Sequence, residues 1–166
     1  MEYKSVFDII GPIMVGPSSS HTAGALGIAR FARNEFKKIP EYTEIILYNS
    51  FAKTYRGHGT DVALIGGILG FEPDDLRIPR ARAIAEEENI QISFVISDED
   101  SWHPNTVRLI LTDGFDILEI EGISIGGGSF KILKNVWSTG ISWSESNVYH
   151  SETITRIMRE RKQVNL

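Results

Sequence analysis

The sequence predicts a two-layer α+β fold, in which helices cover one face of a mainly antiparallel or mixed sheet. Helical patterns dominate the first half of the chain, β-rich runs dominate the second half, and an Asp113-Gly114 pair joins two of those runs. Asp-Gly between two such runs is a strong hairpin signal, and helices segregated from hairpins indicate an α+β layer.

Composition sets the outer bounds on function. The chain has 166 residues, 42% of them hydrophobic and 23% charged, which suits one globular domain. It contains no cysteine, which excludes disulfides, thiol catalysis and an iron–sulfur cluster held by its own thiolates. The net charge of −5 gives no basic footprint for nucleic acid, and the apolar runs are too short for a signal peptide or a membrane span. We therefore expect a soluble, cytoplasmic protein with no nucleic-acid or membrane partner.

An amphipathic helix is expected over residues 22–38. Apolar side chains recur at helical spacing from Ala25 to Phe36, and Pro40 stops the pattern. The other elements of the first half are apolar or β-rich runs bounded by glycine, proline or polar turns. They are a short element over 5–10, a strand over 44–50, a helix over 62–70, a turn over 73–76 and a surface helix over 79–88.

The second half consists of β-rich runs separated by turns. The expected strands cover residues 90–97, 106–112, 115–123 and 130–136. Three glycines at 126–128 break the chain before the last of them. The segment from Ser151 onward can form a helix or fray.

A histidine between two glycines, Gly57-His58-Gly59, is the first candidate for chemistry. Glycines on both sides remove side-chain bulk and allow a small substrate to approach the imidazole closely. Thr60 is a candidate N-cap of the helix that follows, and Asp61 would lie in its first turn, where the helix dipole favours a carboxylate. The alternative is an ordinary turn with no chemical role.

The second candidate is the run Ser18-Ser19-Ser20-His21-Thr22, just before the first long helix. Hydroxyls and backbone N–H groups at a helix start suit a carboxylate or a phosphate. Both histidine loops thus pair an imidazole with a helix N-terminus, and together they would frame a small anionic substrate. Capping of the helix by Ser20 or Thr22 alone is an equally open interpretation.

Other polar segments carry weaker signals. Residues 102–106 are predicted to form a turn in which Asn105 hydrogen-bonds to the local backbone. The glycines at 126–128 are predicted to form either an anion-binding nest or a hairpin connection. Lys53 could form a Schiff base, although the sequence shows no apolar pocket around it. The four histidines are dispersed, so we expect no metal site.

Five runs of residues, in this order, carry a resemblance to a known family: Ser5–Pro12, Gly16–Thr22, Lys53–Asp61, His103–Thr106 and Ser124–Gly128. They resemble the beta chain of bacterial iron–sulfur-dependent L-serine dehydratase. The resemblance covers about residues 5 to 135, and the ordered set is specific although each run alone is weak.

The resemblance implies elimination of water from L-serine to aminoacrylate, which hydrolyses to pyruvate and ammonia. In that family a [4Fe–4S] cluster, held by a separate alpha chain or domain, acts as Lewis acid on the serine hydroxyl. A histidine of the Gly-His-Gly-Thr-Asp motif is the proposed base, which here implies His58. Asp61 would orient it or contact the partner chain, and His21 would contribute across the chain interface.

The remaining assignments complete this interpretation. Substrate binding is expected from Ser18, Ser19, Ser20, Thr22, Lys53 and Thr60. The family's beta region also resembles an allosteric substrate-binding domain of some 3-phosphoglycerate dehydrogenases, which implies effector contacts at His103, Asn105, Gly126, Gly127 and Gly128.

The expected organisation is one domain over residues 1–140 and a divergent tail over 141–166, in place of the ACT domain that two-chain relatives carry. The expected partners are an L-serine dehydratase alpha subunit, which would hold the cluster, and L-serine, with a homodimer as an open alternative. A different function class also fits the residues: a non-catalytic regulatory module that binds serine or a similar small anion.

Overall fold

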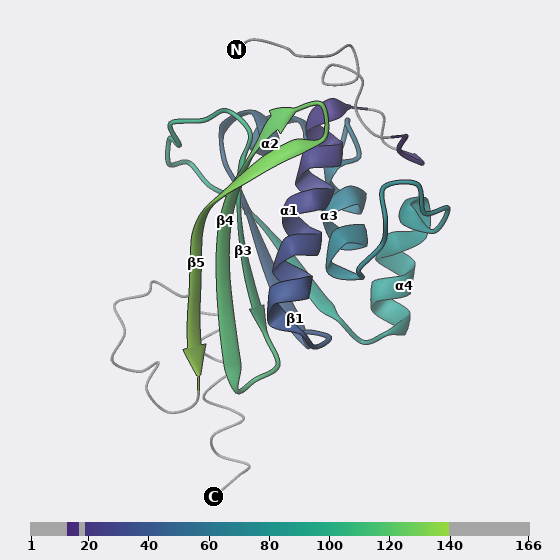
Figure 1. The fold of residues 1–166 in the computed structure, drawn as a ribbon, viewed down its shortest axis with the longest axis vertical. Coiled ribbons are helices and arrows are strands. Elements are labelled where there is room, and N and C mark those ends of the chain that lie inside the picture. The colour runs from purple at the N-terminus through teal and green to yellow at the C-terminus, as the bar shows by residue number, and fades with distance from the viewer. Residues whose placement is uncertain (1–12, 17–18, 140–166) are drawn as a thin grey trace, which may run out of the picture.

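The computed structural model describes residues 13–16 and 19–139 and is built on a five-stranded sheet with strand order β2-β1-β3-β4-β5. The strands are β1 (Tyr42–Leu47), β2 (Gln91–Ile96), β3 (Thr106–Thr112), β4 (Asp116–Gly126) and β5 (Ser129–Thr139). Strands β1 and β2 run parallel, and the other neighbouring pairs are antiparallel. The mixed, mainly antiparallel sheet is the one expected from the sequence (Figure 1).

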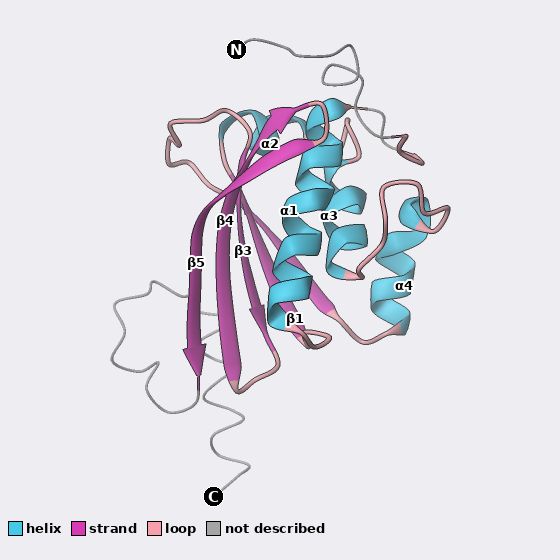
Figure 2. Ribbon diagram, in the orientation of Figure 1, coloured by secondary structure: helices cyan, strands magenta, loops and turns pink. Residues whose placement is uncertain are grey.

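The helices lie on one face of this sheet (Figure 2). They are α1 (Ser20–Phe36), α2 (Asn49–Thr54), α3 (Thr60–Ile68) and α4 (Ala81–Glu87), the last preceded by a 3₁₀ turn over Ile78–Arg80. The predicted two-layer α+β fold is therefore confirmed. Within the described ranges, no helix is long and apolar enough to cross a membrane.

Alternation along the strands explains which face the helices cover. In β1, for example, Ile45 and Leu47 belong to the main hydrophobic core together with Leu109 of β3 and Leu118 of β4. Side chains two residues apart in a strand share a face, so these residues line the helix-covered face of the sheet. Ile28 of α1 is fully buried in the same core.

Helix α1 packs closely against α3, and a glycine makes this approach possible. A Cβ atom on Gly67 would lie 2.5 Å from the Cβ of Ala29 and 2.6 Å from the carbonyl oxygen of Leu26. Such distances are far below normal contact, so the interface requires glycine at this position. The close packing holds the C-terminal part of α3 against the middle of α1.

Several predicted boundaries need correction. The strand expected over 44–50 is Tyr42–Leu47, and the chain then forms the short helix α2, which the sequence analysis missed. Asn49 begins this helix with φ of 46° and Tyr48 before it makes no side-chain cap, so the usual helix-start signals are absent. The elements considered over 5–10 and from Ser151 onward lie outside the described residues.

The hairpin expectations are confirmed. Asp113 and Gly114 lie in the turn between β3 and β4, where Gly114 has φ of 87° and the Asp113 carboxylate accepts hydrogen bonds from the N–H groups of Phe115 and Asp116. Gly127 and Gly128 form the turn between β4, which ends at Gly126, and β5, and all three glycines have positive φ. This second hairpin arches over the N-terminal end of α1 (Figure 1).

Candidate functional site

An open cleft of about 560 Å³ lies beside the turn that precedes α3. His58 lines this cleft with its two flanking glycines, together with Arg56 and Ser19. Ser19 comes from the loop before α1, so the cleft joins the two histidine loops that the sequence analysis singled out. An imidazole, a guanidinium and a hydroxyl around one cleft can bind a small anion and exchange a proton with it.

The two glycines beside His58 have different structural roles. Gly59 has φ of 65° and is the N-cap residue of α3, a backbone conformation that glycine adopts at little cost. Gly57 has no such constraint, and among the described residues a Cβ atom there would meet only the carbonyl oxygen of Thr54, at 3.8 Å. Packing against the described part of the chain therefore does not require glycine at position 57, which lines the cleft.

Hydrogen bonds join the His58 turn to the first turn of α1. The hydroxyl of Thr22 donates to the carbonyl oxygen of His58 over 3.3 Å, and the hydroxyl of Thr60 lies 3.4 Å from that of Thr22. Because the Thr22 proton is directed to His58, Thr60 donates to Thr22. Both threonines are buried, which fixes the turn against the helix.

This arrangement corrects the predicted helix caps. Ser19 is the N-cap of α1, and its Oγ accepts from the N–H of His21 over 3.3 Å, so neither Ser20 nor Thr22 caps the helix. Gly59 holds the N-cap position of α3, and Thr60 is its first residue. The buried hydroxyls of Thr22 and Thr60 bond across the two helices instead of to their own backbone, and Ser19 and Gly59 hold the two N-cap positions.

The imidazole of His21 faces the sheet and contacts residues that the resemblance assigned to an effector site. Its Nδ1 atom lies 3.1 Å from Nδ2 of Asn105 and 3.4 Å from Oγ of Ser124. Asn105 directly precedes β3, Ser124 lies in β4, and the N–H of Ser124 donates to the carbonyl oxygen of Asn105 over 3.0 Å. Pairing of the two strands thus brings both side chains to His21.

The glycine turn between β4 and β5 closes this cluster. The N–H of Gly128 donates to the carbonyl oxygen of Ser20 over 3.1 Å, which ties the hairpin to the first residue of α1. A Cβ atom on Gly126 would lie 3.6 Å from Cε1 of His21. Gly127 lies between them, also with positive φ. The turn is therefore a docked hairpin connection, one of the two alternatives that the sequence left open.

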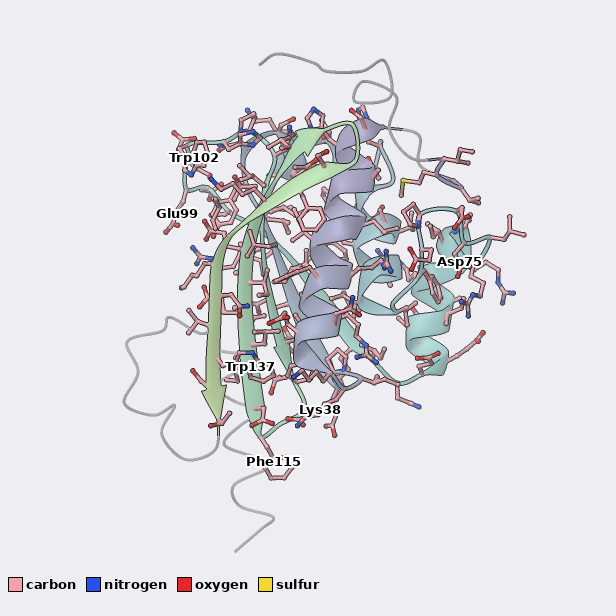
Figure 3. All side chains as sticks on the ribbon, viewed as in Figure 1. Lys38, Asp75, Glu99, Trp102, Phe115 and Trp137 are labelled. Carbon is pink, nitrogen blue, oxygen red and sulfur yellow. The ribbon has the colours of Figure 1, made fainter. Side chains whose placement is uncertain are left out.

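His103 lies at the edge of the same cluster. Its Nδ1 accepts a hydrogen bond from the backbone N–H of Asn105 over 3.2 Å. The indole of Trp102 packs edge-on against its ring, with 5.5 Å between the ring centroids. Partial burial lowers the pKa of His103 below its usual value, and the charge of His21 lowers it further. Figure 3 shows Trp102 at the end of the sheet where β3 begins, opposite to Phe115. The turn expected over 102–106 is confirmed, but the Asn105 side chain contacts His21 rather than local backbone.

Two predicted site residues lie away from these groups. Asp61 is in the first turn of α3, as expected, and its carboxylate pairs with Arg82 at 3.4 Å. Lys53 is exposed in the last turn of α2 and is not among the residues that line the cleft. Ser18, the third predicted anion-binding serine, lies outside the described residues.

Sequence reasoning also missed residues of the site. Arg56 was part of the polar run around His58 but received no role, although it is a cation in the cleft. Ser124 stood beside the glycine run, and its contact with His21 spans 103 residues, so no local pattern could reveal it. The remaining wall of the cleft is formed by Gly16, Val62 and Pro79, which carry no chemical signal in a sequence.

Metal and cluster ligands were tested against the same residues. In the part of the chain that the structure describes, no group of three or more His, Cys, Asp or Glu side chains could hold a metal ion. Iron–sulfur clusters are bound by cysteine thiolates, and this sequence has no cysteine. The residues present therefore do not fit a cluster.

Comparisons with known proteins point in one direction. Residues 5–94, more than half of the chain, match the family model described as serine dehydratase beta chain. The chain is 54% identical over 134 residues to the "Probable L-serine dehydratase, beta chain" of Bacillus subtilis, covering 81% of this chain and 61% of that protein. It is 47% identical over 132 residues to the "L-serine dehydratase, beta chain" of Peptoniphilus asaccharolyticus, covering 78% of this chain and 59% of that protein. A third similar protein is "L-serine dehydratase 2" of Escherichia coli, 30% identical over 149 residues, which cover 75% of this chain and 32% of that protein. The chain thus spans about 60% of the length of the beta chains it matches.

Proposed function

This chain belongs to the serine dehydratase beta chain family, and on that premise we propose that it is the beta subunit of an L-serine dehydratase. The reaction is elimination of water from L-serine, which yields pyruvate and ammonia after hydrolysis of aminoacrylate. The observation that carries the proposal is the cleft in which His58, Arg56 and Ser19 meet.

The cleft has the groups that this chain would contribute to such a reaction. His58 is exposed and stands between two glycines, so its ring can reach a substrate that enters from solvent or from a partner chain. In the proposed reaction His58 removes the α-proton of serine, and Arg56 holds the carboxylate. A well-placed general base contributes about 10²–10⁴-fold to a rate. Elimination of the hydroxyl therefore needs further catalytic groups from outside this chain.

The partner that supplies them is an alpha chain that holds a [4Fe–4S] cluster. When bound, the cluster would supply Lewis-acid chemistry at the substrate hydroxyl. The cysteine-free sequence supports a division in which the cluster belongs to the other chain. In the relative from Escherichia coli the matching region is about a third of one longer chain, which is compatible with the other groups residing in the rest of that protein. Such a cluster would suit the reducing cytoplasm expected from the sequence.

The test is reconstitution with the alpha chain. We expect the two chains to co-purify under anaerobic conditions and to form pyruvate from L-serine, while this chain alone is inactive. His58→Ala is expected to lower kcat by about 10²–10⁴-fold with the complex and its cluster absorbance intact. Phe115→Ala, an exposed change at the opposite end of the sheet, is the control. Unchanged turnover in His58→Ala would remove His58 from the role of base.

A second candidate function is a regulatory module that binds serine or a similar small anion. The observation in its favour is that His21, Asn105 and His103 form a polar cluster whose side chains do not line the cleft. Calorimetry on this chain alone separates the two functions. Measurable affinity for L-serine without the alpha chain supports sensing, and its absence supports a site that two chains share.

A further inference from the structure

We infer that Asn105 is a positioning residue for His21: its amide holds the proton of the neutral His21 ring on Nε2, so that His21 acts as a hydrogen-bond donor and not as a base. The inference deepens the proposed function and rests on it for the identity of the substrate. The assignment of the ring proton itself rests on the contacts of this chain alone.

The first step is the chemistry of the two atoms that meet. Nδ2 of Asn105 carries two hydrogens and has no capacity to accept a hydrogen bond. It lies 3.1 Å from Nδ1 of His21, so Nδ1 must be the acceptor and therefore bears no proton. In a neutral imidazole the single proton is then on Nε2.

The second step is that the backbone of Asn105 is held in place. Its backbone N–H donates to Nδ1 of His103, and its carbonyl oxygen accepts from the N–H of Ser124. The residue is 8% exposed and directly precedes β3, the middle strand of the sheet. The sheet thus fixes the backbone from which the Asn105 amide reaches Nδ1 of His21.

The third step is what His21 can then do. With Nδ1 occupied by Asn105 and with Ser124 Oγ at 3.4 Å as a second contact, Nε2–H is the polar edge left for a ligand. An N–H donor suits a carboxylate oxygen, whereas proton removal needs an unprotonated ring nitrogen. In the dehydratase reaction this assigns the base role to His58 and leaves His21, which does not line the cleft, the role of a hydrogen-bond donor toward an anionic ligand.

The test reads the ring proton directly. Long-range ¹H–¹⁵N correlation spectra of the full chain with labelled histidine, at mildly alkaline pH, distinguish protonated from unprotonated ring nitrogens. The sequence has four histidines, and His21→Gln identifies the His21 signals by their loss. We expect Nδ1 to be unprotonated and Nε2 to be protonated in the wild-type chain. A protonated Nδ1 would overturn the inference without any change to Asn105.

Two substitutions at position 105 sharpen the test. Asn105→Asp replaces the donor by a carboxylate, which only accepts, so the proton should move from Nε2 to Nδ1 of His21. Asn105→Ala removes the partner, so the signals should shift toward a mixture of both tautomers. Asn135→Asp on β5, whose amide donates to Glu35 over 3.2 Å at the surface, is the control and should leave the His21 signals in place. Unchanged His21 nitrogen signals in Asn105→Asp would also overturn the inference.

Activity of the reconstituted complex is the second readout. Asn105→Asp should raise the KM for L-serine more than it lowers kcat, because His21 loses its role as a donor to a ligand while the base His58 remains. A complex that shows no dehydratase activity in the wild type would refute the proposed function but leave the proton assignment intact. An active complex in which Nδ1 of His21 is protonated would refute the proton assignment but leave the proposed function intact. The two failures are therefore distinguishable.

Discussion

The hydroxyl of Thr22 donates a hydrogen bond to the carbonyl oxygen of His58 and thereby joins the first turn of α1 to the turn before α3. This bond crosses 36 residues of sequence, and Thr60 extends it by donating to Thr22. The position of His58 in the cleft thus depends on a buried hydroxyl of another element.

Thr22→Val tests this dependence, because valine keeps the shape of the side chain and removes the hydroxyl. The carbonyl of His58 and the hydroxyl of Thr60 would each lose a partner in a buried site. We expect the free energy of unfolding to fall by about 1–2 kcal/mol, measured by urea denaturation. In the reconstituted complex kcat should fall as well, since the His58 turn loses its anchor. A variant with wild-type stability and turnover would contradict this role of Thr22.

Gly57→Ala separates the two glycines that flank His58. A methyl group at position 57 would lie at an ordinary contact distance of 3.8 Å from the carbonyl oxygen of Thr54. We therefore expect the free energy of unfolding to stay within about 0.5 kcal/mol of the wild-type value. Activity should nevertheless drop sharply, because the methyl group enters the cleft beside the imidazole.

Gly59→Ala is the matched comparison. Position 59 has φ of 65°, where a Cβ atom is strained, so this variant should lose about 1 kcal/mol of stability or more. Equal activity of Gly57→Ala and the wild type would show that nothing approaches the ring from that side.

Gly67→Ala tests the close packing of α3 against α1. The added methyl group would collide with Ala29 and with the backbone of α1, which costs about 1–3 kcal/mol or more in overpacked interfaces. Its neighbour Gly66 provides the control. A Cβ atom there would have its nearest contact at 3.5 Å, so Gly66→Ala should be neutral or stabilise the helix by up to about 1 kcal/mol. Equal stabilities of the two variants in denaturant titrations would rule out the close contact.

The lowered pKa of His103 predicts a pH dependence of stability. Partial burial and then the charge of His21 keep this pKa below its usual value, so the unfolded chain takes up the proton first as the pH falls. The contribution to stability is complete above the ordinary pKa of about 6.5 and is lost as the pH drops below it.

The comparison is between the wild-type chain and His103→Gln, in unfolding titrations from pH 8 to pH 5. The variant should lose less stability than the wild type over the acidic part of this range. A steeper loss in the variant would mean that His103 is stabilised as a cation in the folded chain.

Local patterns predicted the second half of the chain well. The strand over 106–112 agrees in both bounds, and the turn at Asp113-Gly114 is where the sequence indicated it, because glycine with positive φ and an aspartate that caps local N–H groups are local devices. The helix starts were less accurate. Helix α1 begins at Ser20 with Ser19 as its N-cap, and Thr22, the expected start, bonds to His58 instead.

The candidate site could be predicted only in part. The sequence predicted that the two histidine loops frame one site; Ser19 and His58 line the same cleft, whereas His21 does not line it. The sequence analysis assigned His21 to the catalytic site and Asn105 to an effector site. In the structure the two side chains are in contact, although 84 residues separate them in the sequence. That contact arises from the pairing of β3 with β4 and from the docking of α1 on the sheet, which no motif records.

Because β3 is the middle strand of the sheet, the residues that precede it are held from two sides. The segment before this strand is anchored to its neighbours on both sides: the N–H of Ser50 donates to the carbonyl oxygen of Pro104, and the N–H of Ser124 donates to that of Asn105. We therefore expect a ligand bound by His21 to change amide hydrogen exchange at the first turn of α1, which carries His21, more than along β3.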